Sequence, residues 1–176
     1  GTDRGLYDLN TFTTDEAMLP TRGGDWYDGG LWQNLFLHNW GTKNDLVKGS
    51  WDYLYKVIAQ ANQSLDKLKE ILENNPENIS VPKYISEVRA FRAMYYYYLL
   101  DMFARVPLVT SSSVAMEDVV QSERSAVFNF VRTELEESVE DLSDAHSNLT
   151  GEYYGRITKP VAYFLLAKLA LNAEVY

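Results

Sequence analysis

Residues 84–103 read YISEVRAFRAMYYYYLLDMF, and this stretch decides the fold class. Its apolar residues recur at gaps of three and four, which is the spacing of an α-helix with a buried face. Residues 94–100 are apolar or aromatic nearly all round, so more than one neighbouring element has to cover them. We therefore predict a helix between Pro82 and Pro107, with the four tyrosines 95–98 in the core.

Three more segments show helical periodicity. Residues 51–72 carry one apolar stripe and end in the turn 74–76, which contains a proline. Residues 125–142 and 159–175 repeat the pattern, and Thr158 is placed to cap the last helix. The third segment also carries many acids, which predict a solvated helix surface. These acids are Glu134, Glu136, Glu137, Glu140 and Asp141.

The four predicted helices form two hairpins. Their starts fall near Trp51, Lys83, Ser125 and Lys159, and the spacing within each hairpin is close to that of tetratricopeptide (TPR) repeats, about 34 residues. One helix pair cannot bury its own apolar face, so a second pair has to stack on it. We predict an all-α fold with two stacked, TPR-like helical hairpins, an α/α superhelix, over residues 50–176.

Residues 1–49 form a different region. They show no sustained helical or alternating period and are rich in glycine, including the pairs Gly23-Gly24 and Gly29-Gly30. We expect a long, irregular, aromatic-rich segment with one short helix around residues 31–37. Its Trp, Leu and Phe content argues against disorder, so we expect it to pack on the helices.

Composition excludes several classes of protein. The chain has 176 residues, 46% of them hydrophobic, and a net charge of −9, whereas nucleic-acid binding requires a basic face. It has no cysteine, which excludes disulfides, thiolate metal sites and cysteine nucleophiles. No apolar run reaches the about 18 residues that a membrane span needs. The first residues include neither an initiator Met nor an apolar signal core, so we expect any targeting signal to lie upstream.

Few residues have the spacing that catalysis or metal binding requires. His38 and His146 lie far apart without a partner at metal-ligand spacing, and no glycine-rich phosphate loop is present. Asp25 and Asp28 could form a carboxylate pair, but acids among glycines are more often turn formers. We predict no catalytic residue, no metal site and no cofactor.

One loop stands out as a candidate ligand site. Residues 22–32 read RGGDWYDGGLW and place aromatic, charged and glycine residues together outside any helical period. Flat rings can stack on the C–H face of a sugar, while carboxylate and guanidinium groups meet its hydroxyls. The alternative is that Trp26 and Trp32 only pin the segment to the helices. The candidate ligand-binding residues are Arg22, Asp25, Trp26, Tyr27, Asp28 and Trp32.

Several segments together resemble the SusD/RagB family. Residues 87–93 (EVRAFRA) and 95–99, followed by 103–108 (FARVPL), are similar to a run of that family. Residues 51–62 resemble its first helix, and residues 156–171, which begin RITKPVA, resemble its alanine-rich helix. Two departures are Ala104, where the family usually has glycine, and Pro160-Val161, where it usually has an alanine pair. Residues 14–16 and 25–30 also fit its N-terminal region.

The resemblance implies a lipoprotein on the outer face of a Gram-negative outer membrane. Such proteins capture oligosaccharide and deliver it to a SusC-like TonB-dependent transporter without breaking a bond. The lipid-bearing cysteine would precede Gly1. Members are much longer, with a C-terminal half that folds around the repeats, so this chain would be the N-terminal, repeat-containing part without that half.

Three rival functions remain open at this stage. The cargo could be a peptide rather than a glycan. A helical-repeat adaptor would bind a protein partner through its concave face and need no sugar site. A glycosidase would require two carboxylates that converge in a pocket. We favour non-enzymatic glycan capture.

Overall fold

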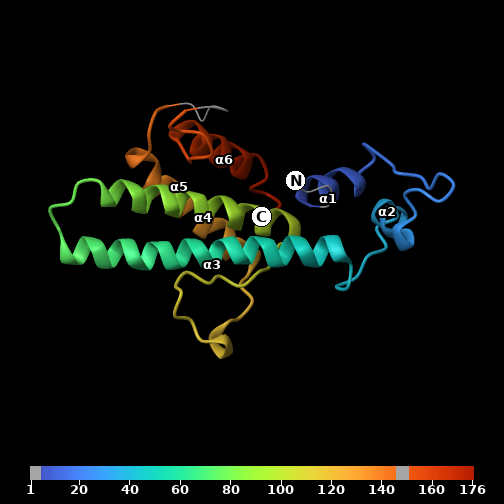
Figure 1. Ribbon diagram of the computed structural model, residues 1–176, viewed down its shortest axis with the longest axis horizontal. Helices are drawn as coiled ribbons and strands as arrows, with labels where there is room; N and C mark the ends of the chain where they lie inside the picture. Colours follow the sequence, from blue (N-terminus) through green and yellow to red (C-terminus); the bar gives the residue numbers. More distant parts are fainter. Residues whose placement is uncertain (1–4, 146–150) are drawn as a thin grey trace. The chain divides into compact units, whose positions relative to one another are not determined.

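The computed structural model describes residues 5–145 and 151–176 and is helical (Figure 1). Within these residues there is no strand, only the isolated bridges Arg22–Asp25 and Pro107–Gln121. The predicted all-α fold is therefore confirmed. His146 lies outside the described residues. The helices are α1 (Leu6–Phe12), α2 (Leu31–Phe36), α3 (Asp45–Asn74), α4 (Val81–Phe103), α5 (Arg124–Ser138) and α6 (Lys159–Leu171), with short 3-10 turns η1 (Asp28–Gly30), η2 (Met116–Asp118) and η3 (Val139–Asp141).

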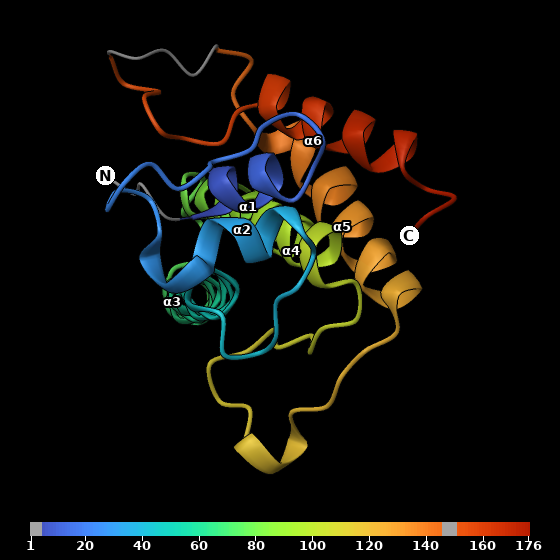
Figure 2. The same cartoon turned by 90° about the vertical axis from the view of Figure 1, so that its right-hand side faces the viewer.

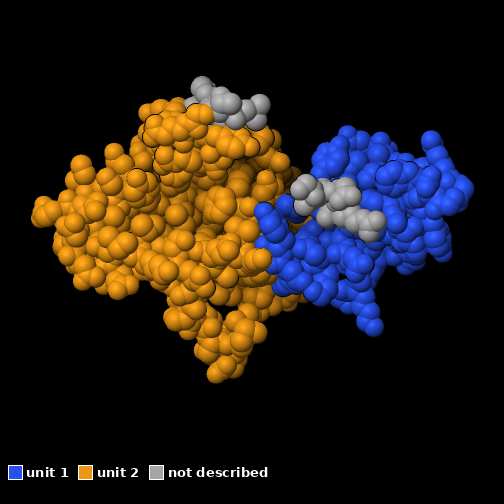
Figure 3. Space-filling view, viewed as in Figure 1, with its two compact units in different colours: residues 1–53 blue, residues 54–176 orange. Residues whose placement is uncertain are grey.

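The chain divides into two compact units, residues 1–53 and 54–176 (Figure 3). The first unit contains α1, α2 and the first turns of α3. The second contains the rest of α3 and all of α4, α5 and α6. Among the described residues, no helix combines the length and the apolar character needed to cross a membrane.

In the second unit, α4 is the helix that its neighbours enclose. It lies between α3 and α5, and α6 packs on both α4 and α5 (Figures 1 and 2). Tyr96 and Tyr97 are buried, whereas Tyr95 and Tyr98 are partly exposed. The prediction that this cluster belongs to the core is therefore confirmed for its two central members, which face neighbouring helices on different sides.

The start of α3 differs from the prediction. Periodicity placed it at Trp51, but the helix begins at Asp45 because the Asn44 side chain caps it. The Oδ1 atom of Asn44 accepts the backbone N–H groups of Leu46 and Val47, at 3.0 and 3.2 Å. Gly49, the last residue of the region expected to be irregular, lies inside the helix. The predicted short helix at 31–37 is present as α2, whereas α1 was not predicted.

The second hairpin also differs in detail. α5 ends at Ser138 and continues only as the 3-10 turn η3, so the regular helix is shorter than predicted. Thr158 stands at the N-cap position of α6, but its side chain makes no capping hydrogen bond. Its buried Oγ1 finds no partner among the described residues. The α6 helix therefore begins without the predicted side-chain cap.

Candidate functional site

The predicted ligand loop, residues 22–32, opens with a tight turn in the first unit. The backbones of Arg22 and Asp25 pair in both directions, with N···O distances of 3.1 and 2.9 Å. Gly23 has a φ of 60°, in the left-handed region that glycine enters without a Cβ clash. The turn leaves the side chains of Arg22 and Asp25 exposed at its two ends.

Trp26 follows this turn in a backbone conformation that bulky residues rarely adopt. Its φ is 63°, and Asp28 has a φ of 40°. Such residues cost about 1 to 3 kcal/mol each and cluster at functional sites. The side chains are not hidden: Trp26 is 51% exposed and Tyr27 is 60% exposed. The loop thus holds two large rings in solvent on a strained backbone.

Trp32 lies beneath these rings rather than among them. It is 3% exposed, and its indole N–H donates to Oδ2 of Asp28 at 2.7 Å. Its ring meets Phe12 of α1 edge to face at 5.1 Å and Trp26 at 6.4 Å. Trp32 and Asp28 therefore fix the loop to the helices of the first unit, while the side chains of Trp26 and Tyr27 remain exposed to solvent.

The exposed part of this loop suits a neutral ring-shaped ligand. Two adjacent aromatic faces are available for C–H contacts, and Arg22 supplies donors while Asp25 supplies acceptors. Sugar hydroxyls both donate and accept hydrogen bonds, so they can use both kinds of group. The carboxylate of Asp28 accepts the indole N–H of Trp32, whereas that of Asp25 is exposed.

His38 has a structural setting in the first unit. Its Nε2 lies 2.7 Å from the backbone oxygen of Thr13, and its ring meets Trp40 edge to face at 5.4 Å. A cluster of three or more His, Cys, Asp or Glu side chains placed to hold a metal ion does not occur in the described part of the chain.

A buried ionic network joins α3, α4 and α5 in the second unit. Arg92 donates to Glu134 at 2.6 Å and to Oδ1 of Asn62 at 2.8 Å, and Arg89 donates to the other oxygen of Glu134 at 2.7 Å. Glu134 is 7% exposed, so the prediction that the acids of this helix are all solvated is wrong for this residue. The sequence feature that could have indicated this pairing is the presence of Arg89 and Arg92 on the largely apolar helix α4, because a buried charge requires a partner.

A second ion pair connects the two hairpins. Arg156 donates to both carboxylate oxygens of Glu87, at 3.0 and 2.7 Å. These hydrogen bonds raise the pKa of Arg156 above its ordinary value. Glu87, Arg89, Arg92 and Arg156 all come from the segments that carried the family resemblance, so those segments are largely structural.

Comparison with known proteins decides the family. A family model described as "Starch-binding associating with outer membrane" matches residues 6–171. The chain belongs to the SusD-like family. It is 24% identical to a SusD-like protein of Bacteroides ovatus over 96% of this chain, and 24% identical to the starch-binding protein SusD of Bacteroides thetaiotaomicron over 98%. It spans 30% and 28% of the lengths of these two relatives.

The solved structures agree with this assignment. A laminarin-binding SusD-like protein superposes with a TM-score of 0.75 and 28% identity, over 94% of this chain and 34% of that one. Both the resemblance seen in the sequence and the fold class are thus confirmed.

Proposed function

We propose that this SusD-like chain is the helical-repeat part of a protein that captures glycan at the outer membrane. The observation that carries the proposal is the pair of exposed rings, Trp26 and Tyr27, on the strained backbone that directly follows the Arg22–Asp25 turn. Trp32 and Asp28 keep this turn in place rather than touch the ligand. Family membership supports a binding role without chemistry, as its description names starch binding.

Isothermal titration calorimetry with maltooligosaccharides and laminarioligosaccharides tests the proposal, since relatives are described as binding starch and laminarin. Trp26→Ala and Tyr27→Ala should each weaken binding by about fivefold or more, which is about 1 kcal/mol. Trp40→Ala and Tyr7→Ala are matched controls in the same unit, because these rings are also exposed but lie outside the loop. Unchanged glycan affinity in both loop variants would remove the site.

The cargo then passes, in this proposal, to a SusC-like TonB-dependent transporter in the same membrane. The protein would be held there by a lipid on a cysteine upstream of Gly1. Co-purification with a SusC-like transporter of the same organism, repeated with and without the glycan, tests this step. Peptides of similar size in the calorimetry separate glycan cargo from peptide cargo.

A protein-interaction module is the second candidate, and one observation favours it. The outer side of α6 exposes Tyr163, Phe164 and Leu171, with exposed fractions of 53%, 63% and 86%. Clustered apolar side chains of this kind mark interaction surfaces. Binding of the transporter that survives Trp26→Ala and fails when Phe164 and Leu171 become polar would favour this function.

A further inference from the structure

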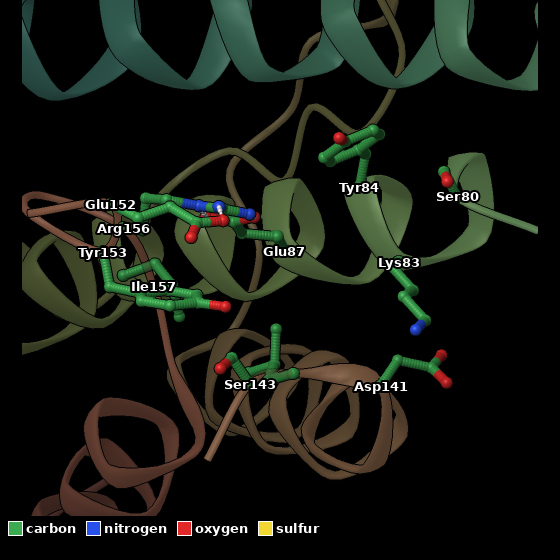
Figure 4. A pocket seen from close by; sticks show the side chains of 11 residues that line it. Ser80, Lys83, Tyr84, Glu87, Asp141, Ser143, Glu152, Tyr153, Arg156 and Ile157 are labelled. Carbon is green, nitrogen blue, oxygen red and sulfur yellow. Dashed lines mark hydrogen bonds and ion pairs between the residues drawn. The ribbon is translucent and has the colours of Figure 1, made fainter. Parts of the chain in front are cut away.

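A pocket of about 330 Å³ lies in the second unit, away from the loop 22–32 (Figure 4). One wall comes from the first turns of α4, with Lys83, Tyr84 and Glu87. The other walls come from residues 141–143, after α5, and from residues 152–157, before α6. A volume of this size is at the lower end of small-molecule sites, which range from about 300 to 1,000 Å³.

The charged side chains that line this pocket are either paired or exposed to solvent: Glu87 and Arg156 pair with each other, and Lys83, Asp141 and Glu152 are exposed. Glu87 and Arg156 form the two-armed ion pair described above, with side chains 20% and 35% exposed. Asp141 accepts a hydrogen bond from the hydroxyl of Ser86 at 2.8 Å. Glu152 lies 3.9 Å from Arg156 and is 75% exposed, so water screens it. A strongly charged ligand would therefore meet no buried, unpaired side chain of opposite charge.

Two aromatic rings accompany these polar groups. Tyr84 is 49% exposed on α4. The ring of Tyr153 lies against the guanidinium of Arg156, at 5.3 Å from its centroid, and Figure 4 shows it along the pocket wall. Aromatic faces next to balanced donors and acceptors suit a molecule that has C–H faces and hydroxyl groups.

A second, smaller pocket of about 140 Å³ adjoins the first. It shares Glu87, Arg156 and Ile157 with the first pocket and adds Val88, Phe91 and Gly155. The Glu87–Arg156 pair therefore lies between the first pocket, which is polar, and the second pocket, which is largely apolar. A ligand with one hydrophilic and one carbon-rich face could contact both sides of this pair.

We propose that this double pocket is a binding site for a neutral polyhydroxy ligand of one or two sugar rings, separate from the loop 22–32. Tyr84 and Tyr153 supply the stacking surfaces, and the Glu87–Arg156 pair supplies acceptors and donors for hydroxyls. The site does not depend on the proposed function of the loop, because its residues all belong to the second unit.

An NMR titration of the isotopically labelled 176-residue chain tests the site. The probes are maltotriose and laminaritriose as sugars, succinate as a dianion and putrescine as a dication. We expect a sugar to shift the amide signals of residues 83–87 and 152–157 in a saturable manner, while succinate and putrescine do not. Saturation by a charged probe alone, or by none of the four, would overturn the proposal.

Tyr84→Ala should weaken this sugar binding by about fivefold or more, because it removes one stacking face. Tyr163→Ala is the matched control, since Tyr163 is a similarly exposed ring on another helix of the same unit. Equal affinities for Tyr84→Ala and the original chain would contradict the assigned role. Trp26→Ala should leave these signals unchanged, so failure of the loop site and failure of this site are told apart in one data set.

Discussion

Ala104 has a backbone conformation that glycine adopts more easily than a residue with a Cβ. It ends α4 with φ 60° and ψ −81°, a sparsely populated conformation that costs a residue with a Cβ about 1 to 3 kcal/mol. Ala104→Gly should therefore stabilise the fold by about 1 kcal/mol and raise the melting temperature by about 2 to 4 °C, as followed by circular dichroism. Ala167→Gly, inside α6, should have the opposite effect. A lower melting temperature for Ala104→Gly would show that this backbone is unstrained.

Tyr96 makes stability depend on pH in the alkaline range. Its hydroxyl donates to the carbonyl of Val109 and accepts from the N–H of the same residue, and burial raises its pKa to about 12. The unfolded tyrosine has a pKa of about 10, so between these values the unfolded chain has lost a proton that the folded chain keeps. The free energy of unfolding should then fall by about 1.4 kcal/mol per pH unit for this residue.

Urea unfolding at several pH values between about 9 and 11.5 measures this slope. Tyr96→Phe should reduce the slope by the amount expected for one tyrosine, although it also lowers the stability at neutral pH. Tyr55, whose pKa burial also raises, accounts for part of the slope that remains. Identical slopes in the Tyr96 variant and the original chain would rule out this assignment.

At the scale of elements, helices that bury apolar stripes could be predicted and those fixed by single polar contacts could not. Tertiary packing selects the three- and four-residue spacing of α4, so its sequence retains that spacing. The first turns of α3 instead depend on the Asn44 cap, and Gly49 within them resembles a break. The pairing of Glu134 with Arg92 was equally hidden, because partners 42 residues apart leave no local pattern.

The network that joins three helices should behave as a unit. Arg92→Met leaves the buried Glu134 with only Arg89 and also deprives Asn62 of a donor, so we expect a loss of about 3 to 5 kcal/mol. The double variant Arg92→Met, Glu134→Leu should lose less than the sum of the two single variants, because no uncompensated carboxylate remains. Chemical denaturation of the four proteins in a double-mutant cycle measures the coupling. Strict additivity would mean that Arg89 or water, rather than Arg92, compensates Glu134.

At the scale of the whole molecule, composition and spacing predicted the class of the fold, whereas the ligand-binding role of the loop 22–32 stays a prediction. They could not tell Trp26 from Trp32, since both are tryptophans in one short segment rich in glycine and aspartate. The difference arises from the backbone: the left-handed conformation of Trp26 presents its ring, whereas Trp32 points into α1. The polar pocket was also beyond prediction, because its walls come from three segments far apart in the chain.

The outer side of α6 makes a prediction about the chain as a whole. A helix that is apolar nearly all round is normally covered, yet Phe164 and Leu171 of α6 are 63% and 86% exposed, and Val175, beyond its end, is 60% exposed. We therefore expect the 176-residue chain to self-associate as its concentration rises, seen as a concentration-dependent sedimentation coefficient.

Phe164→Gln combined with Leu171→Gln should remove that dependence without changing the helical circular dichroism. Ile79→Gln, at an exposed position outside α6, should not. The Nζ atom of Lys168 lies over the Phe164 ring, 5.7 Å from its centroid, and interrupts this apolar face. A chain that sediments as a monomer at all concentrations would show that the apolar face is too small or too interrupted to drive association.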